Sequence, residues 1–187
     1  MPGSSWGGST QVIAETSVKQ LILGGARSGK SRLAEQRAQA SNLPVALVVT
    51  MQPGDDAELV ERIRRHQADR PSHWKVVEAP TGLAAALAPL LAEGYCVLVD
   101  CLTLWLTNLL LLDCEDSLQA ELDALDQLVD GAAGSLIMVS NEVGMGIVPM
   151  GALSRRFQDQ AGWLHQRMAG YCDRVTLSVA GLPLEVK

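Results

Sequence analysis

The sequence predicts an α/β protein in which helices cover both faces of a mostly parallel sheet. Two observations support this fold class. Short runs rich in Val, Ile and Leu recur along the chain, and longer amphipathic segments lie between them. This alternation is typical of parallel strands joined by helical crossovers. The chain has 187 residues and no internal repeat, which suits one domain with a core of its own.

The six apolar runs are bounded by turns or polar residues, which is the pattern of buried strands. These predicted strands are residues 20–25, 45–50, 75–79, 95–100, 135–140 and 174–179. The predicted helices between them are residues 31–40, 57–67, 82–92, 117–130 and 152–169. Residues 1–17 are rich in Gly and Ser and are expected to form a flexible extension, which leaves residues 18–187 as the catalytic domain.

Charge and hydropathy exclude several classes of protein. The formal net charge of -6 argues against nonspecific nucleic-acid binding, which needs a broad basic surface. The most apolar segment, residues 102–112, is too short to span a bilayer and is interrupted by Thr107 and Asn108. The four cysteines show no CxxC spacing, which favours reduced thiols over a metal site. We therefore expect a cytoplasmic enzyme without a membrane span.

A phosphate-binding loop follows the first predicted strand. Residues 24–31, GGARSGKS, fit the pattern G-x-x-x-x-G-K-[ST] and precede the first predicted helix. Glycines let consecutive backbone N–H groups face phosphate oxygens, and the helix adds the positive end of its dipole. Lys30 can reach the β- and γ-phosphates, and Ser31 can supply a hydroxyl to Mg²⁺. The predicted nucleotide-binding residues are Gly24, Gly25, Ala26, Arg27, Ser28, Gly29, Lys30 and Ser31.

Asp100 ends the predicted strand 95–100. Proteins with a phosphate loop place an acidic residue at the end of a neighbouring strand, where it orders the water shell of the metal. The alternative is that this aspartate only caps the next helix. With the phosphate loop upstream, we predict that Asp100 and Ser31 serve Mg²⁺.

The stretch ERIRRHQADRPSHW, residues 61–74, gathers two of the three histidines and four arginines of an acidic chain. On a helix, Glu58, Arg62 and His66 would share one face. Imidazole can attack phosphorus, and nearby arginines can stabilise the charge on the phosphoryl oxygens. A solvated amphipathic helix explains the same pattern, and the residues alone leave the choice open.

Two further segments have weaker signals. His73 is expected to be a turn or packing residue, and His165, within a long predicted helix, is expected to be a surface or interface histidine. The stretch NEVGMGIVP, residues 141–149, carries Glu142 where a GTPase switch protein would have the lysine of its base-reading motif, which argues against that class. This stretch is either a turn that packs Met145 and Ile147 or an active-site loop.

Five motifs in this order resemble the bifunctional adenosylcobinamide kinase/adenosylcobinamide-phosphate guanylyltransferase family of cobalamin biosynthesis. They are GGARSGKS, RIRRHQADRPSHW, LVDCLTLWLTNLL, SNEVGMGIVP and RRFQDQAGWLHQRMA. The resemblance implies a RecA-like P-loop NTPase fold and a homotrimer. It implies that a nucleoside triphosphate, ATP or GTP, phosphorylates a hydroxyl of adenosylcobinamide. GMP is then transferred from GTP to that phosphate, which gives adenosylcobinamide-GDP and pyrophosphate.

The resemblance also implies roles for individual residues. GMP transfer would run through a guanylylated histidine, which by motif position is His66; some relatives have a second histidine where this chain has Arg65. Glu78 would contact guanosine, since a carboxylate can accept from guanine N1–H and N2–H₂. The other implied nucleotide contacts are Thr50, Met51, Gln52, Gln67, Ala68, Asp69 and Arg70. Two alternatives remain: a monofunctional small-molecule kinase with a phosphate loop, and a nucleotide-dependent regulatory binding protein.

Overall fold

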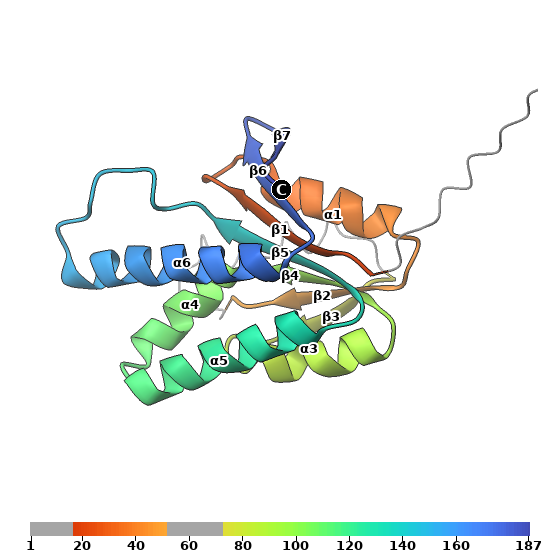
Figure 1. Ribbon diagram of the computed structural model, residues 1–187, viewed down its shortest axis with the longest axis horizontal. Helices are drawn as coiled ribbons and strands as arrows, with labels where there is room; N and C mark the ends of the chain where they lie inside the picture. The colour runs from red at the N-terminus through yellow and green to blue at the C-terminus, as the bar shows by residue number, and fades with distance from the viewer. Residues whose placement is uncertain (1–16, 52–72) are drawn as a thin grey trace, which may run out of the picture.

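The computed structural model describes residues 17–51 and 73–187. Within these ranges one seven-stranded sheet has the order β3-β2-β4-β5-β1-β6-β7, and all neighbouring strands are parallel except the antiparallel pair β6 and β7 (Figure 1). The strands are β1 Lys19–Gly24, β2 Val45–Val49, β3 Lys75–Glu78, β4 Cys96–Asp100, β5 Ser135–Asn141, β6 Arg174–Val179 and β7 Leu182–Glu185. The helices are α1 Lys30–Ala40, α3 Leu83–Ala92, α4 Leu102–Leu111, α5 Glu115–Gly131 and α6 Ala152–Tyr171.

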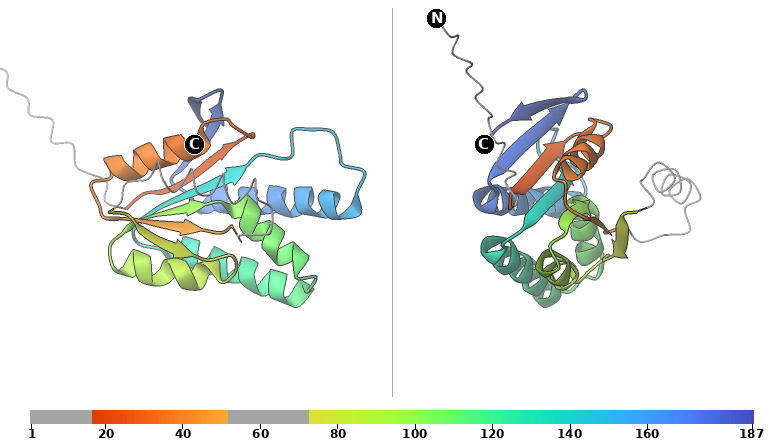
Figure 2. Two further views of the ribbon diagram at one scale, coloured as in Figure 1. Left: turned by 180° about the vertical axis from the view of Figure 1, so that it is seen from behind. Right: turned by 90° about the vertical axis from the view of Figure 1, so that its right-hand side faces the viewer.

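Helices cover both faces of the sheet, as predicted (Figures 1 and 2). Helix α1 packs on one face, where its Ala34 joins Ile22 of β1 in one hydrophobic cluster. Helices α3, α5 and α6 pack on the other face, where Leu21 of β1 joins a second and larger cluster. Adjacent residues of β1 therefore enter opposite cores. Burial on both faces explains why the parallel strands appear in the sequence as continuous apolar runs.

The six predicted strands are confirmed, and four of the five predicted helices match observed helices within two residues at either end. The fifth predicted helix, residues 57–67, lies outside the described residues. The expected N-terminal extension also lies outside them, apart from Ser17, whose Oγ accepts a hydrogen bond from the Gly134 amide at 2.9 Å.

Two observed elements were not predicted. The apolar segment after Cys101 forms helix α4, which is buried on most sides; Trp105 and Leu106 are both 0 % exposed. Strand β7 pairs with β6 through a tight turn at Ala180 and Gly181. No helix in the described part of the chain is long and apolar enough to cross a membrane.

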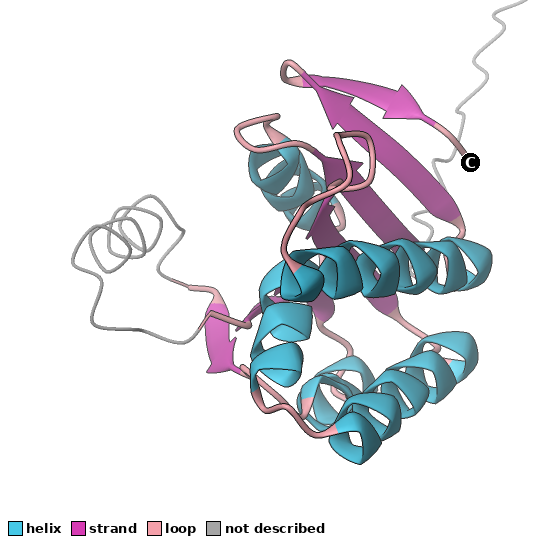
Figure 3. Ribbon diagram, turned by 90° about the vertical axis from the view of Figure 1, so that its left-hand side faces the viewer, coloured by secondary structure: helices cyan, strands magenta, loops and turns pink. Residues whose placement is uncertain are grey.

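The carboxyl ends of three neighbouring strands meet at one edge of the sheet, and loops leave from this edge (Figure 3). Gly24 of β1 pairs with Asn141 of β5, and Asp100 of β4 pairs with Val139 of β5. This register brings the phosphate loop, the acidic end of β4 and the loop after β5 together. Parallel sheets bind their ligands at such an edge.

Candidate active site

The phosphate loop connects β1 to α1 and depends on two of its glycines. Gly29 caps α1 with φ of 90°, a left-handed conformation that favours glycine. Gly24 allows a close approach: a Cβ at this position would lie 2.4 Å from Ser28 Oγ and 2.7 Å from the carbonyl oxygen of Ser178. The local fold therefore requires glycine at both ends of the loop.

Hydrogen bonds from neighbouring segments to the backbone carbonyls of this loop hold it in place. The Ser28 carbonyl accepts from the Gly181 amide and from Ser178 Oγ, both at 2.8 Å. The Gly24 carbonyl accepts from the Glu142 amide at 3.0 Å. Ser28 Oγ is buried and has no hydrogen-bond partner among the described residues. The loop is thus fixed from the β6–β7 turn on one side and from the end of β5 on the other.

Lys30 begins α1, and its Nζ donates to the Gly25 carbonyl at 3.1 Å, so the side chain folds back over the loop. Ser31 follows in the same first turn and is half-buried. Asp100, also half-buried, ends β4 at the same edge. A hydroxyl and a carboxylate are hard oxygen donors that suit Mg²⁺, which takes one or two protein ligands together with water and substrate phosphates. The donor set therefore fits the predicted metal.

Thr50, the residue directly after β2, holds the backbone that follows Asp100. Its Oγ1 donates to the Cys101 carbonyl at 2.7 Å and accepts from the Cys101 amide at 3.0 Å. Its amide donates to the Asp100 carbonyl at 3.2 Å. Thr50 is 0 % exposed, so its hydroxyl positions the strand ends in this structure. Its contact with a nucleotide stays a prediction.

The remaining predicted contacts divide into described and undescribed residues. Met51 is half-buried and follows Thr50, and Glu78 ends β3 in an exposed position. Glu78 pairs with Val49 of β2, and Val49 also pairs with Asp100, so these two carboxylates lie at the same edge with one strand between them. The other predicted residues, Gln52, His66, Gln67, Ala68, Asp69 and Arg70, lie outside the described residues.

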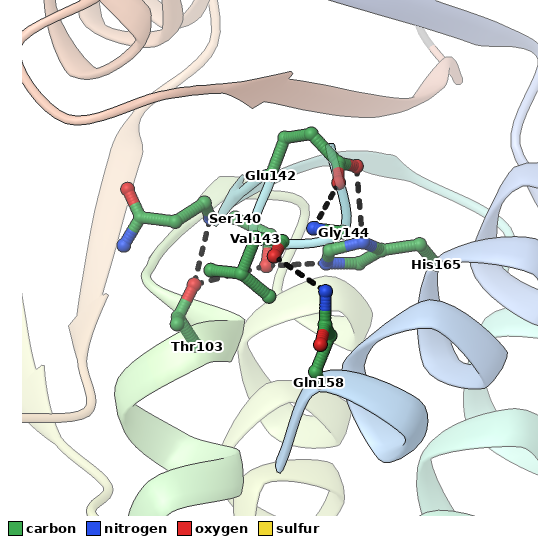
Figure 4. A network of polar contacts seen from close by, with 8 residues as sticks. Thr103, Ser140, Glu142, Val143, Gly144, Gln158 and His165 are labelled. Atoms are coloured by element: carbon green, nitrogen blue, oxygen red, sulfur yellow. Dashed lines mark hydrogen bonds and ion pairs between the residues drawn. The ribbon is translucent and has the colours of Figure 1, made fainter. Parts of the chain in front are cut away.

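A polar network unites the end of β5 with α4 and α6 (Figure 4). Thr103 Oγ1 lies 3.1 Å from Ser140 Oγ, which in turn lies 2.7 Å from His165 Nε2. Glu142 places one carboxylate oxygen 3.9 Å from His165 Nδ1. The other carboxylate oxygen accepts from the Gly144 amide at 2.6 Å. The network therefore leads from a buried helix to Glu142, whose backbone amide bonds the phosphate loop.

One prediction about this region is wrong, and one of the two alternatives for residues 141–149 is excluded. His165 is not a surface residue: it is 7 % exposed, and burial lowers the pKa of its imidazole, although the charge of Glu142 acts in the opposite direction. Met145 and Ile147 do not pack inside a turn, since they are 78 % and 97 % exposed. Thr103 and Ser140 were not predicted as site residues.

The cysteines are all free, and Cys96, Cys101 and Cys172 are buried. Burial and the neighbouring charge of Asp100 raise the pKa of Cys101, and burial raises the pKa of Cys172 to about 12. Both are therefore neutral thiols near neutral pH, and Cys101 serves the site through its backbone.

Comparisons with known proteins agree on one family. The sequence pattern of the family described as "Cobinamide kinase / cobinamide phosphate guanyltransferase" matches residues 20–186. The chain is 54% identical over 170 residues to the bifunctional adenosylcobalamin biosynthesis protein CobP of Pseudomonas aeruginosa, covering 91% of this chain and 98% of that protein. It is 36% identical over 180 residues to the bifunctional protein CobU of Salmonella typhimurium, covering 89% and 98%.

Solved structures support the fold. The RadB recombinase has a TM-score of 0.50 at 16% identity and covers 87% of this chain and 75% of its own. An ATPase of the type III secretion system of pathogenic bacteria has a TM-score of 0.54 at 11% identity and covers 91% and 57%. Both likenesses agree with the predicted RecA-like P-loop fold. The phosphate loop, the sheet that carries it and the two bifunctional relatives lead to one assignment: the chain belongs to the cobinamide kinase / cobinamide phosphate guanyltransferase family.

Proposed function

We propose that the chain phosphorylates adenosylcobinamide with a nucleoside triphosphate and then transfers GMP from GTP to adenosylcobinamide phosphate. The products of the second reaction are adenosylcobinamide-GDP and pyrophosphate. The observation that carries this proposal is the phosphate loop of residues 24–31, held at the carboxyl edge of the sheet in a member of this family. A cytoplasmic location and a homotrimer complete the proposal.

Both reactions use the same phosphate loop in this proposal. Lys30 and the backbone N–H groups of the loop would hold the triphosphate, and the N-terminus of α1 adds its dipole. Ser31 and Asp100 would hold Mg²⁺, which neutralises charge on the phosphate oxygens when it is bound. Loop and helix positions that are fixed before the substrate arrives favour catalysis, because little reorganisation is needed during the reaction.

GMP transfer would proceed in two displacements through His66. An imidazole nitrogen attacks the α-phosphorus of GTP, a P–N bond forms, and pyrophosphate leaves with the electron pair of the broken P–O bond. A phosphate oxygen of the corrinoid then attacks the same phosphorus and releases the imidazole. The choice of His66 depends on its motif position, and Glu78 is proposed to recognise the guanine edge.

Labelling with GTP tests the histidine intermediate. Incubation with α-labelled GTP and Mg²⁺ should give a protein-bound label that is acid-labile and base-stable, with release of pyrophosphate. The label should be lost in His66→Ala and kept in His73→Ala, the matched control within the same basic stretch. A label at another residue, or none during turnover, would contradict the mechanism.

The same preparation separates the alternatives. Phosphorylation of cobinamide without any covalent label would favour a monofunctional kinase. Absence of both activities, with nucleotide still bound, would favour a regulatory binding protein.

A further inference from the structure

Glu142 is attached to the phosphate loop through its backbone. Glu142 directly follows Asn141, the residue of β5 that pairs with Gly24. Its amide donates to the Gly24 carbonyl at 3.0 Å. The residue that carries this carboxylate therefore touches the first glycine of the loop and leaves the sheet at the edge where a triphosphate would bind.

The carboxylate of Glu142 is held by neighbouring groups but can accept further hydrogen bonds. One oxygen accepts from the Gly144 amide at 2.6 Å, and the other lies 3.9 Å from His165 Nδ1. Within residues 17–51 and 73–187, His165 is the only group at ion-pair distance from it. A carboxylate offers about four lone-pair sites, so most of them remain available to a substrate. The side chain is 19 % exposed, so part of it is accessible to solvent.

A directed chain of hydrogen bonds fixes His165. The Asn141 amide donates to Thr103 Oγ1 at 2.7 Å, so the Thr103 hydroxyl proton is free for Ser140 at 3.1 Å. In this order Ser140 Oγ can donate to His165 Nε2, which lies 2.7 Å away. The remaining ring proton stays on Nδ1, the nitrogen that faces Glu142 (Figure 4). Every hydroxyl in this order both donates and accepts, which is the arrangement that satisfies buried polar groups.

We propose that Glu142 accepts the proton of the substrate hydroxyl in the kinase reaction, and that His165 is the positioning residue that orients its carboxylate. This inference rests on the proposed function. The hydroxyl oxygen attacks the γ-phosphorus, and a new P–O bond forms. The bond from the γ-phosphorus to the β–γ bridging oxygen breaks, and the nucleoside diphosphate leaves with its electron pair. The hydroxyl proton passes to a remaining lone pair on the Glu142 oxygen that faces His165, and then to solvent.

The two half-reactions provide the test, because only one of them removes a hydroxyl proton. The kinase reaction is followed with cobinamide and ATP, and GMP transfer is followed with cobinamide phosphate and GTP. Glu142→Gln keeps the size of the side chain and can still accept from Gly144, but it cannot take a proton. It should lower the kinase kcat by about 100-fold or more. GMP transfer should change by less than about threefold.

A matched control is Asp159→Asn, an exposed carboxylate on α6 that makes the same chemical change. It should alter neither rate. A wild-type kinase rate in Glu142→Gln would overturn the proposal. An equal fall of both half-reactions would also overturn it, because Glu142 would then act through the phosphate loop. Absence of both activities in the wild-type protein would instead overturn the proposed function itself, which is a distinct result.

His165→Phe tests the positioning role, since it fills the same space without a ring N–H for Glu142. The kinase kcat should fall about tenfold while KM for cobinamide and the rate of GMP transfer stay near wild type. A merely structural role would lower both half-reactions together. The ratio of the two rates therefore separates positioning from loss of folding.

Discussion

The phosphate loop and the loop after β5 lie side by side at one edge of the sheet, yet they are held in different ways. The phosphate loop is held through its carbonyls, which accept from Gly181, Ser178 and Glu142. The loop after β5 is held through side chains, namely Thr103, Ser140, His165 and Gln158, which come from β5 and two helices. The first arrangement depends on backbone shape and the second on side-chain identity.

The two ways of holding a loop suit two tasks, which are binding the triphosphate and serving the acceptor. A nucleoside triphosphate is bound in both half-reactions. A loop that binds phosphate through backbone groups suits a ligand that stays the same. The acceptor differs between the half-reactions, being a hydroxyl in one and a phosphate in the other. A carboxylate positioned by side chains can serve one acceptor without affecting the other. Substitutions in the two loops should therefore have different consequences, in the following order of size.

Lys30→Ala should have the largest effect. It removes the cation that is proposed to bind the β- and γ-phosphates, and electrostatic donors of this kind contribute about 100- to 1,000-fold in rate. Both half-reactions should fall by about that factor when they are measured separately. Lys75→Ala, an exposed lysine on β3, is the control. A loss confined to one half-reaction would contradict a phosphate loop that serves both reactions.

Gly24→Ala should reduce the free energy of unfolding by about 3 kcal/mol, because overpacking at a rigid site has costs of this order. Its Cβ would lie 2.7 Å from the Ser178 carbonyl oxygen, a backbone atom that cannot easily move. Gly25→Ala is the matched control, since its Cβ would meet nothing within 4 Å. The free energy of unfolding of both variants is measured by denaturation in urea. Equal stability of the two variants would contradict the packing account.

His165→Phe should destabilise the fold by about 2 kcal/mol near neutral pH, because Ser140 Oγ loses its hydrogen-bond partner on α6. The effect should depend on pH. Burial lowers the pKa of His165, so its contribution to stability is present above the unfolded value of about 6.5 and is lost as pH falls toward the folded value. Unfolding at about pH 7.5 and about pH 5.5 should therefore show a smaller difference from wild type in acid. A difference that does not change with pH would contradict this assignment.

Ser178→Ala should have the smallest effect, about 1 kcal/mol in the free energy of unfolding. The Ser28 carbonyl loses the bond from Ser178 Oγ but keeps the bond from the Gly181 amide. Both half-reactions should stay within about twofold of wild type. A large loss of activity would mean that the loop depends on this side chain more than on backbone bonds.

Local patterns predicted most of the fold. The parallel strands and the phosphate loop have signals within a few consecutive residues, and their predicted positions are confirmed. Helix α4 was missed because its residues are apolar on nearly all sides, which removes the amphipathic period that marks a helix. Strand β7 was missed because all four of its residues are exposed and one is Pro183, so neither burial nor alternation marks it.

The network around Glu142 could be predicted only in part. His165 lies four residues after Ala161 and three before Met168, and all three are buried, so helical spacing did signal a core position. Its partners gave no such signal. Thr103 and Ser140 lie 37 residues apart in sequence and meet only because β4 and β5 are neighbours in the sheet. Contacts of this kind depend on tertiary packing.

In the proposed function one phosphate loop serves both reactions, and competition between nucleotides tests this sharing most directly. An ATP analogue with a β,γ-imido bridge cannot donate its γ-phosphoryl group but should occupy the loop. We predict that it inhibits phosphorylation of cobinamide and guanylylation of His66 competitively, with the same inhibition constant in both assays. Guanylylation that continues at its full rate, at analogue concentrations that stop the kinase reaction, would contradict the claim.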